Sequence, residues 1–385
     1  MIDWHASNKL GKAVDEIIEN AHKYVKSQNY AKALPIIFAV IEGMCEPLYN
    51  SDDSSGSIGG CIDGAVYLLR QTANECSQPD IQRTVFEACV KYFKRELYKG
   101  FDWYRDFIEI AATLVDNNND FATIMHLLDQ PQDSEYTVKH LQTVKFKLLK
   151  QFKGDAEAER YLETNIANSD LRKQAIELAI SKQDYAKAIR LAHDGIENDK
   201  IKYPGLVCSW YEYLLKVAQA QKDTPKIIEY ARHRLIDNFS PEQDYYKILK
   251  ETVEPQQWLS FFDGMIEDFK KSKHCSTYSI ADLYVKEEMW DRLFALVNEN
   301  QTFSFIEHYE TYLAENYSDQ LSTMYANLIL KYMEYNMSRS HYQNACRYIR
   351  RMIKLGARTK ADKVIAKLRS LYPKRKALME ELERV

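Results

Sequence analysis

The sequence predicts an all-α chain, an irregular α-solenoid of antiparallel helical hairpins with roughly 18–21 helices. Three observations support this prediction. Apolar residues recur at three- and four-residue steps along nearly the whole chain, glycine (12) and proline (9) are scarce, and a six-residue phrase occurs twice. Sustained alternation of Val, Ile or Thr with polar residues is missing from the sequence, so almost no strand is expected.

The repeated phrase marks the turns between helices. It reads Gln-Asn-Tyr-Ala-Lys-Ala from Gln28 to Ala33 and Gln-Asp-Tyr-Ala-Lys-Ala from Gln183 to Ala188. Each copy follows one apolar-periodic segment and opens another, which predicts a tight turn between two antiparallel helices. The ring and the alanine three positions later share one helix face, where a small residue lets the partner helix approach. Weaker echoes begin at Trp290 and Tyr342.

The length favours an extended or divided architecture. A chain of 385 residues exceeds the usual size of one compact core, so two domains or a stack of hairpins are expected. We divide the sequence into an N-terminal helical hairpin (1–50), a flexible acidic, Ser- and Gly-containing loop (51–60), an α-solenoid body (61–337) and basic C-terminal helices packed on the solenoid (338–385).

The first hairpin contains one irregularity. Its helices are predicted over Lys9–Gln28 and Tyr30–Leu48, and Pro35 lies inside the second. A proline in a helix interior removes a backbone hydrogen bond. The second helix therefore either starts late or is kinked at Pro35, and the sequence leaves both alternatives open.

The loop over 51–60 contains two adjacent carboxylates, Asp52 and Asp53, among serines and three glycines. Such oxygen atoms could hold a hard cation. The alternative is an exposed turn in which Asp and Ser cap neighbouring helices. We favour the turn because the ligand spacing of an EF-hand is missing.

Beyond this loop, most predicted helices are short and closely spaced. Proline occupies an expected first turn at Pro79, Pro225, Pro241, Pro255 and Pro373. The predicted ranges are 58–76, 80–99, 102–116, 120–130, 134–152, 155–167, 170–182, 185–198, 205–221, 225–238, 241–251, 255–272, 277–286, 289–299, 303–315, 318–336, 340–355, 359–371 and 374–384.

Targeting and redox signals are sparse. No apolar run approaches the length of a membrane span, and the first residues lack the pattern of a signal peptide. Neither a membrane span nor a membrane partner is therefore expected. The odd number of cysteines, without paired spacing, predicts reduced and mostly buried thiols in a cytoplasmic protein. These cysteines are Cys45, Cys61, Cys76, Cys89, Cys208, Cys275 and Cys346.

Catalytic motifs are missing from the sequence. Neither zinc-ligand spacings nor glycine-rich phosphate loops nor a Gly-x-Ser-x-Gly turn occur. The pair His193-Asp194 is typical of metal phosphohydrolases, but it is expected to face solvent. Cys275 follows His274, and adjacent side chains point apart. We therefore predict no enzyme activity and no catalytic, cofactor-binding or metal-binding residue.

The C-terminal end carries the strongest local signal. From Ser338 to Val385, 14 Lys and Arg residues oppose 4 Asp and Glu residues, whereas the remainder is acidic. Arg347, Arg350, Arg351 and Lys354 are expected to form one cationic face. Such a surface could bind nucleic acid or another polyanion, or it could be solvated or pack against acidic parts of the chain. The candidate polyanion-binding residues are Arg347, Arg350, Arg351, Lys354, Lys360, Lys363, Lys367, Arg369, Lys374, Arg375 and Lys376.

The two ends together resemble a family. The junction at Tyr30 leads to Asp52-Asp53-Ser54-Ser55-Gly56, and the Tyr-x-x-Ala helix at Tyr342 leads to the segments 366–372 and 374–382. This pattern resembles the helical region C-terminal to the zinc finger in bacterial SWIM zinc-finger proteins, over nearly the whole chain. The resemblance implies a Cys-x-Cys…Cys-x-His zinc module upstream, with a role in DNA or protein interaction. Zinc is expected only with such a module, because this sequence lacks its ligands.

The hairpin junction also resembles tetratricopeptide repeats. Tyr30 and Ala33 match the aromatic residue and alanine of the second repeat helix, and Ile37 and Val40 continue its buried face. No fixed period of about 34 residues connects the copies of the phrase. Tetratricopeptide-like geometry with irregular helices is therefore expected.

These observations lead to one main functional hypothesis and two alternatives. The main hypothesis is a non-enzymatic helical-repeat scaffold for protein–protein interaction, the C-terminal part of a SWIM zinc-finger-like protein with a partner protein. The first alternative is nucleic-acid binding through the basic C-terminal helices. The second is an enzyme whose site the sequence does not reveal. The sequence leaves the oligomeric state open.

Overall fold

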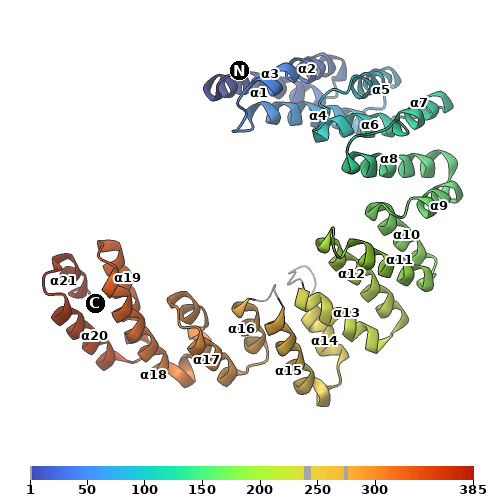
Figure 1. Ribbon diagram of the computed structural model, residues 1–385. Coiled ribbons are helices and arrows are strands. Elements are labelled where there is room, and N and C mark those ends of the chain that lie inside the picture. Colours follow the sequence, from blue (N-terminus) through green and yellow to red (C-terminus); the bar gives the residue numbers. More distant parts are fainter. Residues whose placement is uncertain (1, 238–243, 273–275) are drawn as a thin grey trace. The chain divides into compact units, whose positions relative to one another are not determined.

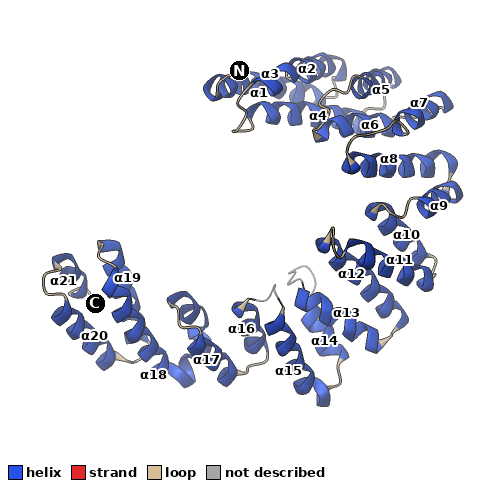
Figure 2. Cartoon of the chain, viewed as in Figure 1, coloured by secondary structure: helices blue, strands red, loops and turns tan. Residues whose placement is uncertain are grey.

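The computed structural model describes residues 2–237, 244–272 and 276–385. These residues form 21 helices, and the one β-bridge among them joins Ile2 to Ser51. Figures 1 and 2 show helices joined by short connections from one end of the chain to the other. The predicted all-α class is confirmed.

The chain divides into two compact units, Met1–Val217 and Ala218–Val385. The first unit contains a hydrophobic core cluster whose buried residues extend from Ala21 to Leu148. Its helices are α1 (Trp4–Lys26), α2 (Tyr30–Gly43), α3 (Cys45–Asn50), α4 (Ser57–Glu75), α5 (Pro79–Lys94), α6 (Asp102–Thr113), α7 (Asn118–Leu128), α8 (Glu135–Lys153), α9 (Asp155–Thr164), α10 (Ser169–Ser181), α11 (Tyr185–Asp199) and most of α12 (Pro204–Gln221).

In the second unit, helices neighbouring in sequence also pack as neighbours. Within each unit the helices form the predicted irregular α-solenoid of antiparallel, tetratricopeptide-like hairpins. The second unit contains α13 (Thr224–Asp237), α14 (Tyr245–Thr252), α15 (Pro255–Lys271), α16 (Thr277–Lys286), α17 (Trp290–Glu299), α18 (Phe303–Tyr335), α19 (Arg339–Lys354), α20 (Arg358–Leu371) and α21 (Lys376–Leu382).

Most predicted helix ends are within three residues of the observed ends, but the helix predicted over 80–99 stops early. α5 ends at Lys94, and Glu96 and Tyr98 have φ angles of 52° and 59°. The Tyr98 side chain is buried, and its hydroxyl donates a hydrogen bond of 2.8 Å to the Ile41 carbonyl oxygen. The apolar pattern therefore continues past the helix end because a turn residue covers the core.

The loop predicted over 51–60 is shorter than expected, because α4 begins at Ser57. The Asp53 carboxylate accepts hydrogen bonds from the backbone amides of Ile58 (2.8 Å) and Gly59 (2.9 Å). These amides belong to the first turn of α4 and have no partner within the helix. Asp53 thus caps α4, as the turn interpretation predicted.

The second helix of the first hairpin differs from the prediction. It begins at Tyr30 and contains Pro35, so the late start is wrong. Ala31, whose carbonyl oxygen would otherwise bond to residue 35, is exposed. The segment predicted as one helix to Leu48 is divided, with α2 ending at Gly43 and α3 beginning at Cys45.

The repeated phrase marks a helix end with a defined geometry. Gln28 and Gln183 both have a left-handed backbone, with φ of 58° and 60°. The amide of Asn29 donates to the Tyr24 carbonyl, and that of Asp184 donates to the Ala179 carbonyl, both at 2.8 Å. This six-to-one hydrogen bond, with a left-handed residue before it, is the Schellman motif. The first residue of the phrase therefore ends one helix, and its tyrosine begins the next.

The same geometry recurs where the sequence signal is weak. Lys222, Glu288 and Gly356 have φ of 57°, 54° and 82°, and each precedes an amide that donates to the carbonyl five residues earlier. The echo at Trp290 is thus a junction of this type. The echo at Tyr342 is not, because Tyr342 lies inside α19, whose N-cap is Ser338.

Small residues let neighbouring helices approach. A Cβ atom at Gly195 would lie 2.7 Å from the ring of Trp210, which is fully buried and donates to Asp199 (2.8 Å). A Cβ atom at Gly11 would lie 2.7 Å from the Cβ of Ser57. These two glycines set the spacing of α11 with α12 and of α1 with α4.

Residues 303–335 form one long helix with an interruption. The sequence predicted separate helices over 303–315 and 318–336, and Tyr317 has the non-helical angles φ −127° and ψ 18°. Its ring stacks on Phe294 of α17, with the centroids 4.2 Å apart. The helix is therefore kinked where the pattern predicted a break.

We predict that Gln183→Gly stabilises the protein by about 0.5–1 kcal/mol, because a left-handed backbone strains any residue with a Cβ atom. Chemical denaturation measures the effect. The control is Gln320→Gly, an exposed position inside α18, where glycine should cost about 1 kcal/mol. Destabilisation by both substitutions would contradict the assigned role of Gln183.

Candidate functional site

The cationic face predicted on α19 is largely an internal contact. Arg351 pairs with Glu307 (2.9 Å) and Glu310 (3.1 Å) of α18, and Arg347 pairs with Glu307 (2.8 Å). The side chains of Arg351 and Glu310 are only 26% and 12% exposed. Two of the predicted polyanion-binding residues therefore bind acidic groups of the same unit.

Tyr325 completes this ion-pair cluster. Its hydroxyl donates to Glu310 at 2.7 Å. Burial tends to lower the pKa of Arg351, but the hydrogen bond and charge of Glu310, with Tyr325 and Glu307, raise it overall. Burial also raises the pKa of Tyr325, and the Glu310 carboxylate adds to this effect. The cluster is a satisfied charge network that joins α18 to α19.

Three further predicted cations contact their own unit. Arg350 donates to the Arg384 carbonyl (3.2 Å), and Lys360 pairs with Asp319 of α18 (2.7 Å). Arg375 donates to the Met333 carbonyl (2.8 Å), and its guanidinium lies 3.8 Å from the centre of the Tyr372 ring. Arg375 thus ties the start of α21 to the end of α18.

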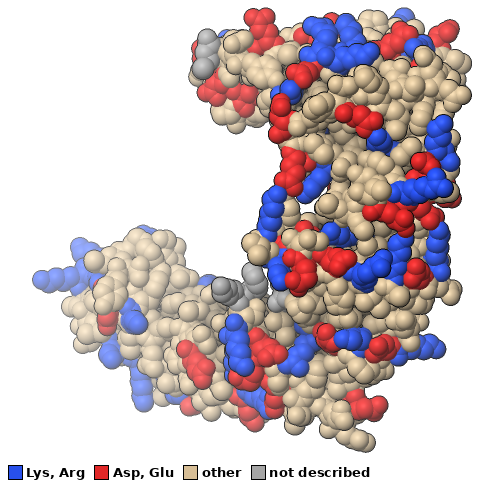
Figure 3. All heavy atoms as spheres, turned by 45° about the vertical axis from the view of Figure 1, so that its right-hand side comes forward, with Lys and Arg blue, Asp and Glu red and all other residues tan. Residues whose placement is uncertain are grey.

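The remaining predicted cations are exposed. In the described part of the chain, no acidic group forms an ion pair with any of them. In Figure 3, blue side chains project from the C-terminal end of the chain with few red groups beside them. These residues are Lys354, Lys363, Lys367, Arg369, Lys374 and Lys376, and we call them the exposed basic set.

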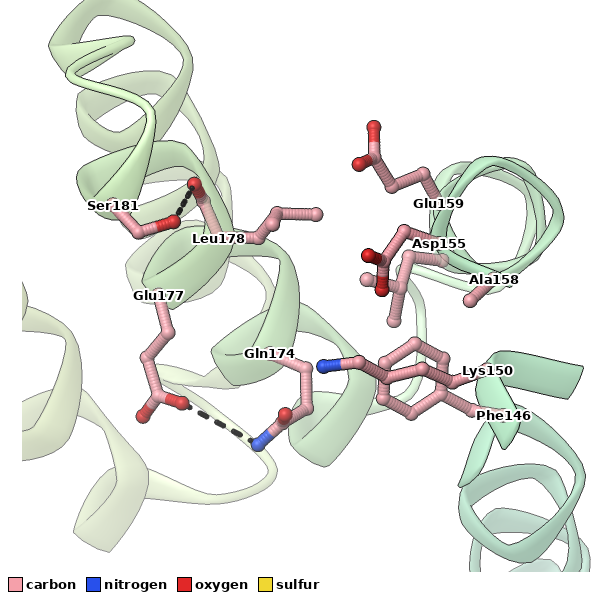
Figure 4. A pocket seen from close by; sticks show the side chains of 10 residues that line it. Phe146, Lys150, Asp155, Ala158, Glu159, Gln174, Glu177, Leu178 and Ser181 are labelled. Carbon is pink, nitrogen blue, oxygen red and sulfur yellow. Dashed lines mark hydrogen bonds between the residues drawn. The ribbon is translucent and has the colours of Figure 1, made fainter. Parts of the chain in front are cut away.

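The first unit contains a groove that was not predicted from the sequence. It has a volume of about 240 Å³ and lies between α8, α9 and α10. Phe146, Ala158, Leu162 and Leu178 supply its apolar lining, and Figure 4 shows Phe146 and Leu178 reaching into the gap between these helices. The remaining lining residues are polar: Lys150, Asp155, Glu159, Gln174, Glu177 and Ser181. We call this site the α8–α10 groove.

Acidic groups dominate one wall of the groove. α9 supplies Asp155 and Glu159 to this wall, and its other two carboxylates, Glu157 and Glu163, lie outside the lining. The wall formed by α10 contributes one carboxylate, Glu177, which accepts hydrogen bonds from Gln174 (3.4 Å) and from the Tyr213 hydroxyl (2.7 Å). The groove thus combines an apolar floor with an acidic wall.

Sequence reasoning missed this groove because its lining residues come from three helices. Phe146 and Leu178 follow the same helical period as residues of the core, so their position in a groove leaves no local mark. The acidic run in α9 was the one available signal.

Thiols and metal ligands give no alternative site in the described residues. No group of three or more His, Cys, Asp or Glu side chains could hold a metal ion there. Burial raises the pKa of Cys61 to about 12, with Asp15 adding to the effect, and raises that of Cys346 to about 11. His193 and Asp194 face solvent, as predicted. Cys275 and His274 lie outside the described residues.

None of the described helices has the length and apolarity required to cross a membrane. No protein-family model matches the chain, and no curated protein matches it.

Several solved structures are similar to the chain, each at 13% sequence identity. A structure of Naa15/Naa10 bound to HypK-THB aligns over 96% of this chain, with a TM-score of 0.32. This chain spans 65% of the length of the matched chain. A circular tandem repeat protein aligns over 99% of this chain and 92% of its own (TM-score 0.22). A monomeric mutant of IFIT1 with m7Gppp-AAAA aligns over 96% of both chains (TM-score 0.22).

We predict that Glu310→Gln destabilises the protein by about 1–3 kcal/mol, because it weakens the charge compensation of the half-buried Arg351. Glu315→Gln is the control, since Glu315 is exposed on the same helix. It should change the free energy of unfolding by less than about 0.5 kcal/mol. Urea denaturation measures the free energy of unfolding of both variants. Equal changes in the two would rule out a stabilising role for the ion-pair cluster.

Proposed function

We propose that this chain is a non-enzymatic helical-repeat scaffold that binds a partner protein. The α8–α10 groove is the observation that carries the proposal. Its lining combines the buried Phe146, Ala158 and Leu162 with the partly exposed Leu178, so one side of the groove floor is open to solvent. A concave apolar surface between helices is a common docking site for an amphipathic helix.

The size of the groove restricts what can enter it. A volume of about 240 Å³ accommodates one or two large apolar side chains. The occupant we propose is an amphipathic helix of the partner, with Leu or Phe as its anchor.

The negative charge of α9 indicates which residues the partner helix should carry beside its apolar anchor. Glu159, which lines the groove, pairs with Lys182, but this pair lies at the surface. A surface ion pair contributes little to stability, so a cation of the partner could replace Lys182 beside Glu159 at small cost. Asp155 forms no ion pair with any described residue. Lys or Arg residues beside the apolar anchor would therefore complement this wall.

The resemblance to SWIM zinc-finger proteins extends this proposal. In that setting the helical chain would work in the cytoplasm of a bacterium, C-terminal to a zinc module. Zinc would be held by that module, and the chain itself would use no cofactor. Whether a coding sequence continues upstream into a Cys-x-Cys…Cys-x-His motif tests this extension directly.

A second candidate function is polyanion binding. The exposed basic set supports it, because these six cations remain without an acidic partner among the described residues. The proposed contact lies mainly on α20 and the segment that follows it. Arg347 and Arg351 are left out because they pair with Glu307 and Glu310.

Peptide binding tests the groove. The probe is a fluorescein-labelled 18-residue helix with Leu on one face and Lys on its flanks, and a Leu/Glu peptide of the same pattern is the reference. We expect the Lys peptide to bind at least about tenfold more tightly, and the double variant Asp155→Lys/Glu159→Lys to remove that preference.

The matched control for this test is Glu157→Lys/Glu163→Lys. It makes the same charge change on the same helix, at positions outside the groove lining. This variant should retain most of the preference for the Lys peptide. If both double variants lose the preference for the Lys peptide equally, the peptide is attracted by the overall charge of α9 and the groove is not its binding site.

Polyanion binding is tested with a 20-base-pair DNA duplex and the corresponding single strand. We expect Lys363→Glu/Lys367→Glu to weaken binding at least about tenfold at low salt. The slope of log K against log salt concentration should also decrease by the contribution of about two phosphate contacts. The control Lys9→Glu/Lys12→Glu makes the same charge change on exposed residues of α1. Equal losses in both variants would exclude a specific basic surface.

A further inference from the structure

The second unit contains a pocket built around the kink of α18. It has a volume of about 650 Å³ and is lined by the turn between α16 and α17 and by the kinked turn itself. The turn residue Glu288 has a left-handed backbone, and Trp290 begins α17 immediately after it. The full lining is Glu288, Met289, Trp290, Asp291, Arg292, Asn316 and Tyr317.

Aromatic contacts hold this pocket in shape. The Trp290 ring is stacked with Tyr312 at an interplanar angle of 15°, with centroids 6.1 Å apart. The Tyr317 ring lies against Phe294, and its hydroxyl donates to the Asp291 carboxylate. That hydrogen bond raises the pKa of Tyr317. Two aromatic side chains of the lining, Trp290 and Tyr317, are thus fixed by other rings.

The charge of the lining is unbalanced. Glu288 and Asp291 are exposed carboxylates, and neither forms an ion pair within the described ranges. The one cation of the lining, Arg292, is paired with Asp263 of α15. The pocket therefore presents two negatively charged carboxylates beside aromatic rings. The guanidinium of Arg292 does not neutralise them, because it is paired with Asp263.

We propose that this pocket binds the guanidinium group of an arginine side chain from a partner protein. A guanidinium is planar, stacks on aromatic faces and forms paired hydrogen bonds with carboxylates. Trp290 and Tyr317 supply the rings, and Asp291 and Glu288 supply the acceptors. A lysine ammonium would gain the charge interaction but not the stacking, so arginine is favoured.

This inference rests on the proposed scaffold function, since the partner supplies the arginine. The pocket would add a second contact point, on the unit that does not contain the α8–α10 groove. The two sites have separate lining residues, so a failed peptide test at the groove leaves the arginine test valid.

The experiment uses the full chain labelled with nitrogen-15. Its five tryptophans each give one indole signal, and Trp290→Phe identifies the signal of Trp290. The probe is N-acetyl-arginine N-methylamide. We expect a saturable shift of the Trp290 signal, at least about fivefold weaker binding of the lysine analogue, and no saturable shift with the neutral citrulline analogue.

Two substitutions test the carboxylates. Asp291→Asn keeps an acceptor for the Tyr317 hydroxyl but removes the charge, and it should weaken arginine binding about tenfold. Glu299→Gln, at an exposed position of the same helix α17, is the control and should bind as the parent chain does. Equal shifts with arginine and citrulline, or no shift of the Trp290 signal up to 50 mM probe (on the order of the weakest specific side-chain binding), would overturn the proposal.

Discussion

The fold depends on reversing the chain within two residues while the last carbonyl groups of a helix stay bonded. Gln28, Gln183, Lys222 and Glu288 meet this constraint with a left-handed backbone at residues other than glycine. Such a conformation costs about 1–2 kcal/mol per residue. The Schellman hydrogen bonds and the packing of the next helix offset that cost. Ala33 and Ala188, buried just after two of these turns, then let the paired helices approach closely.

The sequence was most informative where the signal is local. Tyr30 and Tyr185 begin helices as the repeated phrase predicted, and the break in the pattern near Tyr317 coincides with the kink of α18. The junctions after Lys222 and Gly356 were not recognised as copies of the repeated phrase. The Schellman motif requires a residue with a left-handed backbone there, and it does not require the Tyr or Ala of the phrase. Helix ends are thus set by backbone hydrogen bonds that several different residues satisfy.

The number of charged residues could be predicted from the sequence, but their ion-pair partners could not. Composition gave the excess of cations after Ser338, yet it could not assign Arg351 to Glu310, whose position is 41 residues earlier. Pairing across that separation depends on which faces of α18 and α19 meet. As a consequence, Arg347 and Arg351 of α19 stabilise the unit, whereas the exposed basic set, most of which lies on α20 and the segment after it, has no acidic partner among the described residues. The two pockets were hidden for the same reason, since each is assembled from separate helices.

The hydrogen bonds of the helix junctions have a consequence for the kinetics of folding. Each junction closes with bonds that reach back at most five residues, as from Asn29 to Tyr24. Little loop-closure entropy is lost in forming them, so a hairpin can nucleate as soon as its own two helices are available. Folding can then proceed from hairpin to hairpin behind the ribosome, without waiting for distant parts of the chain. A chain with local turns of this kind can fold while it is being made.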